Sequence, residues 1–251
     1  METLTNQALA TLLISLRIAP TLTFAPPFTL MRIPATVRLV LGISLAGWLV
    51  AAYPQQTSQT DFRTTGLIVT AASELLLGIA LALALQLAFA ALLTAGRTID
   101  IQAGYGLATL IDPGTRAQVP LVGTFFAYAA ALIFFSADGP ADLLAIWGSS
   151  VAQVPLGGAG FGGKIGILAA YMSAIFVMAF GAAGLVMLVL FLIDLAIAFM
   201  SRTLPQMNVL ILGFQVKTVA TVAVLPIALA LSATLFLRML RFALQTTSEM
   251  I

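Results

Sequence analysis

The sequence predicts an all-α integral membrane protein built from helical hairpins, with about six long hydrophobic segments in 251 residues. Hydrophobic residues make up 61% of the chain and charged residues only 8%. Soluble proteins average roughly 45–50% apolar and about 25% charged residues. The mean hydropathy of +1.10 also indicates a membrane protein. The longest apolar runs could cross a hydrocarbon core of about 30 Å as helices. We therefore expect residues 1–251 to form a single membrane subunit.

Six apolar runs define the expected helices, and prolines, glycines or polar residues separate them. These runs span residues 8–24, 39–53, 64–95, 121–135, 165–200 and 219–237. The first ends at the breaker pair Pro26-Pro27, and the fifth ends before Pro205. The stretch from Asp138 to Lys164 contains Pro155 and a glycine cluster, which predicts a looser connection. The fifth run would be about 50 Å long as one helix, more than a single upright span uses.

Composition excludes most familiar active sites. The chain has no cysteine and no histidine, which rules out disulfides, Ser-His and Cys-His catalysis, and metal sites with these ligands. Its net charge of +2 comes from scattered residues, so nucleic acid is not expected as a partner. The segment 158–164 has the spacing of a phosphate-binding loop, but Ile165 replaces the required Ser or Thr and no strand precedes it. We expect no enzymatic activity, no cofactor and no metal.

Polar residues and glycines concentrate between residues 96 and 120, between two apolar runs. Arg97 and Asp100 are three residues apart, so on a helix they share a face and can form an ion pair. Gly104 and Gly106 weaken a helix that continues past them. This pattern predicts a helix end, a constrained loop and a new helix that begins near residue 120.

The loop itself joins an apolar tip to a tight turn. Leu107, Leu110 and Ile111 precede Asp112-Pro113, residue types that favour a turn. The apolar tip could pack into the core of the protein, or it could act outside it. A carboxylate dyad of Asp100 with Asp112 is disfavoured, because the turn and the glycines do not place the two side chains face to face.

Three charges, Arg17, Glu74 and Asp194, lie within apolar runs, where an unpaired charge is costly. One interpretation is structural, with the charges paired inside a helical bundle or with a neighbouring subunit. The other is a small-solute secondary transporter that uses Glu74, Asp194 and broken helices as a site near the bilayer midplane.

Four motifs occur in an order that indicates a family. They are the stretch 96–120, Ile33–Arg38, Phe134–Gly139, and Leu204–Asn208 followed by Gly213. Together they make nearly the whole chain similar to the R subunits of the flagellar type III export gate, the FliR family. The T subunits of injectisome export gates are relatives of that family.

This resemblance implies a structural and gating subunit that assembles with P-type and Q-type subunits into a helical hetero-oligomeric gate at the base of the flagellar rod. Further implied partners are the B-type and A-type export-apparatus membrane proteins, rod and basal-body components, and unfolded export substrates. The implied location is the bacterial inner membrane at the flagellar basal body. Residues 1–164 would be P-like and residues 165–251 a Q-like hairpin. An injectisome export gate is the alternative.

The resemblance also assigns roles to residues. The plug that helps close the pore would consist of Gly106, Leu107, Ala108, Thr109, Leu110, Ile111, Asp112 and Pro113. From the residues themselves, we expect the ion pair of Arg97 and Asp100 to anchor the base of this loop, and Arg17, Glu74 and Asp194 to be buried charges that support assembly. The partner-contact loop would contain Pro205, Gln206 and Asn208. Relatives often carry phenylalanine where this chain has Leu107 and Leu110, so its apolar seal is smaller.

Overall fold

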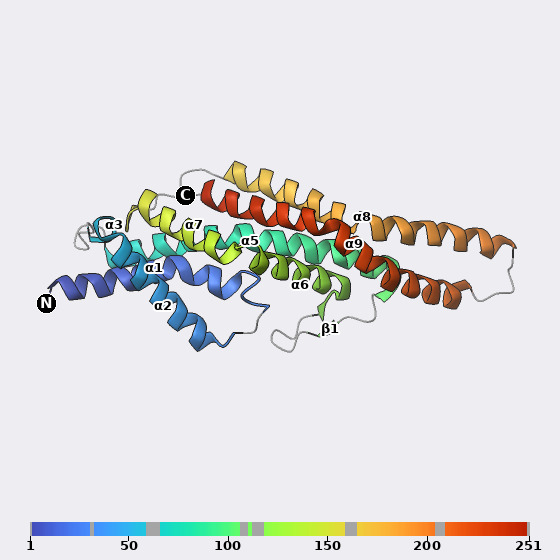
Figure 1. The fold of residues 1–251 in the computed structure, drawn as a ribbon, viewed down its shortest axis with the longest axis horizontal. Helices are drawn as coiled ribbons and strands as arrows, with labels where there is room; N and C mark the ends of the chain where they lie inside the picture. Colours follow the sequence, from blue (N-terminus) through green and yellow to red (C-terminus); the bar gives the residue numbers. More distant parts are fainter. Residues whose placement is uncertain are drawn as a thin grey trace. The chain divides into compact units, whose positions relative to one another are not determined.

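The computed structural model describes residues 2–30, 33–58, 66–105, 110–111, 118–158, 165–203 and 209–249. Nearly all of them are helical, and the prediction of an all-α fold is confirmed (Figure 1). The helices are α1 Glu2–Phe24, α2 Ala35–Ala52, α3 Pro54–Ser58, α5 Leu67–Ala103, α6 Leu121–Ser136, α7 Gly139–Gln153, α8 Ile165–Thr203 and α9 Val209–Glu249. Two short strands, β1 Leu110–Ile111 and β2 Gln118–Val119, form an antiparallel ladder.

Five helices are long and apolar enough to cross a membrane, namely α1, α2, α5, α8 and α9. The pair α6 and α7 is bent by 72° and counts as a sixth span if the two helices cross together. The expected number of hydrophobic segments is therefore confirmed. With 39 residues, α8 is about 58 Å long, well beyond a hydrocarbon core of about 30 Å.

The chain divides into two compact units. Unit 1 comprises residues 1–87, 134–172 and 240–251, and unit 2 comprises residues 88–133 and 173–239. The boundaries of these units differ from the predicted division into 1–164 and 165–251, whose P-like and Q-like character stays a prediction.

The core of unit 1 lies where α1 packs on the first half of α5. Ile14 and Ile18 of α1 and Leu81 and Leu85 of α5 are buried. A Cβ atom added at Gly78 would lie 2.5 Å from the carbonyl oxygen of Arg17. Only glycine therefore allows the two helix backbones to approach this closely.

In unit 2, α8 and α9 form an antiparallel pair, drawn in orange and red (Figure 1). The hydroxyl of Ser232 donates to the carbonyl of Ala182 at 3.3 Å, and Lys217 pairs with Asp194 at 2.5 Å. Residue numbers rise along α8 as those of their partners fall along α9, which is the pattern of a hairpin. Phe126 of α6 completes this core against Phe236, with ring centroids 5.6 Å apart.

Helix α7 corrects the expected loose connection after residue 138. It has 15 residues and begins after Asp138, whose φ of 58° is left-handed. Leu143, Trp147 and Val151 recur every four residues and are all buried, so they form the inner face of a helix. A glycine and two serines at 148–150 interrupt the apolar pattern, so the helical periodicity of this face is hard to recognise in the sequence.

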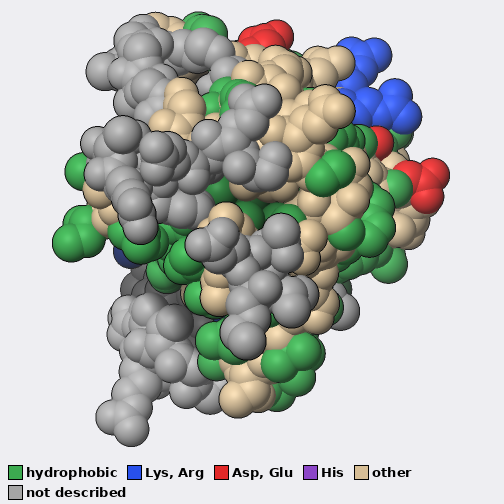
Figure 2. All heavy atoms as spheres, turned by 90° about the vertical axis from the view of Figure 1, so that its left-hand side faces the viewer, with side chains coloured by type: hydrophobic (Ala, Val, Ile, Leu, Met, Phe, Trp, Pro, Cys, Tyr) green, Lys and Arg blue, Asp and Glu red, His purple; other side chains and the backbone are tan. Residues whose placement is uncertain are grey.

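Large apolar side chains remain exposed on several helices. In the most hydrophobic windows of α8 and α9, only 33% and 22% of residues are buried. The face drawn in Figure 2 shows hydrophobic side chains at the surface, with charged ones gathered towards its upper right edge. Exposed apolar area on this scale requires cover by lipid or by another protein.

Candidate functional site

The candidate site is the base of the central polar stretch in unit 2, where α5 ends and α6 begins. Helix α5 ends at Ala103, and Gly104 follows with a φ of +87°. The amide of Gly104 donates to the carbonyl of Ile101 at 3.2 Å. Glycine takes a left-handed φ at no steric cost, so Gly104 ends the helix as predicted.

Asp100 ties the end of α5 to the start of α6. Its side chain is 5% exposed, and its two carboxylate oxygens accept the amide N–H of Val122 at 3.1 and 3.3 Å. Val122 lies in the first turn of α6, where the amides lack helical partners and the helix dipole favours a negative charge. Asp100 therefore caps α6 from a neighbouring helix.

The predicted ion pair of Arg97 with Asp100 is wrong. Between described residues, the ion pairs are Arg17 with Glu74 and Lys217 with Asp194. Arg97 is exposed while Asp100 is buried, so the two side chains occupy different environments. The carboxylate forms a tertiary contact with α6 in place of the local pair expected from the spacing.

The same two helices approach closely through a pair of glycines. A Cβ atom added at Gly96 would lie 2.1 Å from the Cα atom of Gly123, so α5 and α6 meet backbone to backbone. Beyond this contact, Leu110 pairs with Val119 and Ile111 with Gln118 in the β1–β2 ladder. The chain therefore leaves α5 and returns to α6 at adjacent points.

Lys217 of α9 binds the end of α5 from the other side. Its ammonium group donates to the carbonyl oxygen of Gln102 at 3.1 Å and lies 2.5 Å from a carboxylate oxygen of Asp194. The side-chain amide of Gln102 donates to the carbonyl oxygen of Met187 at 3.1 Å. One residue of α5 thus contacts both helices of the α8–α9 hairpin.

Tyr105 adds a second contact between this helix end and α9. Its hydroxyl donates to the carbonyl oxygen of Thr218 at 3.4 Å, and its ring meets Phe214 edge to face at a centroid distance of 6.5 Å. A cavity of about 750 Å³ adjoins these contacts. It is lined by Gly104, Asp194, Ile197, Ile211, Gly213, Phe214, Gln215 and Lys217.

Among the described residues that line it, most are apolar, and the charged ones are Asp194 and Lys217, which pair with each other. Within the described ranges, no three acidic side chains gather closely enough to hold a metal ion. The arrangement can position backbone, but the described side chains offer no set of groups for acid-base or metal chemistry.

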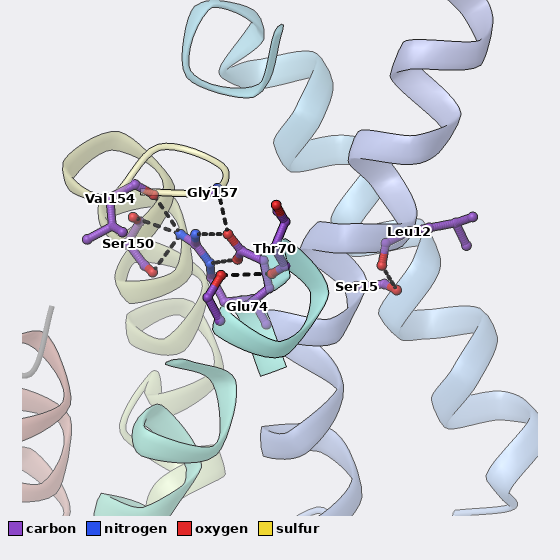
Figure 3. Close-up of polar contacts among 9 residues, drawn as sticks. Leu12, Ser15, Thr70, Glu74, Ser150, Val154 and Gly157 are labelled. Carbon is purple, nitrogen blue, oxygen red and sulfur yellow. Dashed lines mark hydrogen bonds and ion pairs between the residues drawn. The ribbon is translucent and has the colours of Figure 1, made fainter. Parts of the chain in front are cut away.

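Arg17 forms a separate buried cluster in unit 1. Figure 3 shows Glu74, Ser150 and Val154 around one guanidinium group, with Gly157 next to Glu74. Arg17 donates to the two carboxylate oxygens of Glu74 at 2.6 and 2.9 Å. It also donates to the carbonyl oxygens of Ser150 and Val154 at 2.9 and 3.0 Å.

Glu74 is fully buried, and both of its oxygens are bonded to groups of the chain itself. Besides Arg17, the amide of Gly157 donates to Glu74 Oε1 at 3.2 Å. The side chain of Asp194 is 42% exposed within the chain and pairs with Lys217. Its burial in an assembly stays a prediction. With both carboxylates engaged, the geometry gives no support to a solute site built on them.

Lys217 was not predicted as a site residue, although the sequence carried a signal for it. Asp194 is the single charged residue between Lys164 and Arg202, and Lys217 the single one between Arg202 and Arg238. The two lie at nearly equal distances in the sequence from Pro205, which separates the fifth and sixth runs. If these two runs form a hairpin, the two charges lie next to each other. The pair of Asp194 with Lys217 could therefore have been predicted from the sequence.

Several predicted site residues lie outside the described residues, so their roles stay predictions. They are Gly106, Leu107, Ala108, Thr109, Asp112 and Pro113 of the plug, and Pro205, Gln206 and Asn208 of the partner-contact loop. Leu110 and Ile111 are described only as the backbone of β1.

Comparison with known proteins gives a consistent result across most of the chain. A family model described as "Bacterial export proteins, family 1" matches residues 8–243. The flagellar biosynthetic protein FliR of Bacillus subtilis (strain 168) is 32% identical over 214 residues, which cover 83% of this chain and 81% of that protein. FliR of Escherichia coli (strain K12) is 26% identical over 200 residues, or 79% of this chain and 76% of that protein.

A translocation protein from Yersinia also matches. Yop proteins translocation protein T of Yersinia pestis is 26% identical over 193 residues, which cover 72% of this chain and 73% of that protein. The chain is therefore similar both to flagellar FliR proteins and to the Yersinia translocation protein. Identity and coverage are higher for the flagellar relative from Bacillus subtilis.

Proposed function

The chain belongs to the bacterial export proteins of family 1, and on this premise we propose that it is a structural, non-enzymatic subunit of the flagellar type III protein export channel. The observation that carries this proposal is the family match over residues 8–243. The long apolar helices place such a subunit in a membrane. We infer that this is the bacterial inner membrane at the flagellar basal body.

The flagellar assignment is favoured over the injectisome by the comparisons. The Bacillus subtilis flagellar protein matches 83% of this chain at 32% identity, whereas the Yersinia pestis translocation protein matches 72% at 26%. The substrates would then be unfolded flagellar proteins, and an injectisome gate remains the second candidate.

We further propose that the chain assembles with P-type and Q-type subunits, next to A-type and B-type membrane proteins and rod components. The exposed apolar surface supports this step, because α8 and α9 bury only a minor part of their hydrophobic windows within the chain. Helices of partner subunits would cover the part that lipid does not. The Q-like role proposed for residues 165–251 is consistent with the antiparallel pairing of α8 and α9.

For gating, we propose that residues 106–113 form an apolar plug. The support is the geometry of the base, since α5 and α6 meet at Gly96 and Gly123 and Asp100 joins them again at Val122. A loop whose two ends are held by these contacts can be directed towards a pore. Apolar side chains such as Leu107 and Leu110 can then exclude water and ions without any chemical step.

Deleting residues 106–112 tests the plug. We expect the assembled gate to pass more ions in planar bilayer recordings, because the apolar constriction is lost while both helices keep their contacts. The double variant Leu107→Phe and Leu110→Phe is the matched control, and it should lower the leak since larger rings fill more of the pore. Unchanged conductance in a fully assembled deletion variant would contradict the plug.

A further inference from the structure

We propose that Lys217 is a positioning residue that couples the α8–α9 hairpin to the end of α5, from which the central stretch departs. All residues that form this coupling lie in unit 2. Its consequence for channel closure rests on the function proposed above, whereas the coupling itself can be measured independently of that function.

The carbonyl groups at the end of α5 need hydrogen-bond donors from outside the helix. The last four carbonyls of a helix lack helical partners and carry the negative end of its dipole. The carbonyl of Ile101 accepts the amide of Gly104 at 3.2 Å. The carbonyl of Gln102 accepts the ammonium of Lys217 at 3.1 Å, so a cation from another helix caps this end.

Asp194 fixes the position of that cation. A lysine side chain is flexible and loses considerable rotamer entropy when it is held in one place. The carboxylate of Asp194 lies 2.5 Å from the ammonium, and the side chain of Lys217 is only 19% exposed. Lys217 therefore joins three helices at one point, since its own helix is α9, Asp194 belongs to α8 and Gln102 to α5.

The two ends of the central stretch consequently have different supports. The end at Gln102 and Tyr105 is bonded to the hairpin through Lys217, Met187 and Thr218. The other end is bonded to α5 itself, because Asp100 accepts the amide of Val122 in α6. Loss of the contact with Lys217 would therefore free the first end from the hairpin while the second end stays bonded to α5.

Spin-label distances test this coupling directly. The chain has no cysteine, so Ile101→Cys and Val219→Cys provide two unique label sites that are 64% and 70% exposed. In the full chain purified in detergent, we expect one narrow distance distribution. Lys217→Met should abolish this narrow peak, whereas the matched loss of an exposed α9 cation, Arg238→Met, should preserve it. A narrow peak that survives Lys217→Met would overturn the proposal.

A double variant separates positioning from simple stabilisation of the hairpin. Lys217→Met with Asp194→Leu removes both charges and leaves no unpaired carboxylate, so the α8–α9 contact and the melting temperature should recover. The carbonyl of Gln102 still lacks its donor, so the narrow distance peak should stay absent. Recovery of that peak in the double variant would show that the unpaired carboxylate of Asp194, and not the lost donor to Gln102, had removed it, which would overturn the positioning role.

Conductance of the assembled gate distinguishes failure of this inference from failure of the plug. If deletion of residues 106–112 causes a leak, Lys217→Met should also cause one, and a tight gate in that variant would refute the coupling to closure. If the deletion causes no leak, the plug fails, and the spin-label result still decides whether Lys217 positions the end of α5.

Discussion

Arg17 shows how one residue organises three helices of unit 1. Arg17 lies in α1 and is fully buried. Its guanidinium group donates to Glu74 in α5 and to carbonyl groups at the end of α7. A buried guanidinium is tolerated only when its charge and its N–H groups are satisfied. The cluster therefore requires α1, α5 and the end of α7 to lie in one arrangement.

Replacing Glu74 by glutamine should destabilise the protein strongly. The substitution keeps the size of the side chain but removes the charge that balances Arg17, and breaking a buried pair in this way costs about 3–5 kcal/mol. We expect a lower melting temperature in detergent and poorer assembly with partner subunits. A melting temperature equal to that of the parent would contradict the structural role of the pair.

The control for this prediction removes both charges. Arg17→Met with Glu74→Leu leaves no unpaired charge, so it should melt above the single Glu74→Gln variant. If the gate assembled normally with Glu74→Gln while transport of a small solute ceased, the structural interpretation of Glu74 would fail.

Of the site residues, the charges within apolar runs were the ones that the sequence could indicate. Arg17, Glu74 and Asp194 stood out because an intramembrane charge needs a partner. Their partners depend on which helices meet, and spacing along the chain carries little of that information. The local pair of Arg97 with Asp100 failed for this reason, since Asp100 instead accepts an amide from α6.

At the scale of elements, the contact of α5 with α6 depends on glycine. Gly96→Ala places a Cβ atom 2.1 Å from the Cα atom of Gly123, which the backbones cannot accommodate without moving. Overpacking of this kind costs about 1–3 kcal/mol. We expect a lower melting temperature and, in the assembled gate, a larger ion leak because the base of the stretch shifts.

The matched control is Gly181→Ala in α8 of the same unit, where an added Cβ atom meets nothing within 4 Å. Alanine favours a helix over glycine by about 1 kcal/mol, so this variant should be neutral or slightly more stable. Equal melting temperatures for the two variants would show that the approach of α5 to α6 is not close.

The helices themselves were largely predictable, because apolar length and breakers determine them. The third run was expected over 64–95, and α5 spans Leu67–Ala103. Its extra turns contain Arg97 and Asp100, and Gly104 stops it with a φ of +87°. Helix α7 was missed because its buried face lies among glycine, serine and proline residues, which usually indicate a loop.

For the whole molecule, the sequence indicated the family through four ordered motifs, and the match over residues 8–243 confirms it. Hydropathy could not separate helices that face lipid from helices that face protein, since both need apolar surfaces and internally satisfied backbones. The structure shows how much apolar surface the chain leaves exposed. In the most hydrophobic windows of α8 and α9, only 33% and 22% of residues are buried. A subunit of this kind should depend on partners for its stability.

Native mass spectrometry of the chain in mild detergent tests the central claim most directly, with and without co-expressed P-type and Q-type subunits. An export-gate subunit should give a defined hetero-complex that requires all three proteins, and alone it should show a mixture of oligomeric states because its apolar helices are uncovered. A stable homo-oligomer that ignores these partners would contradict the account.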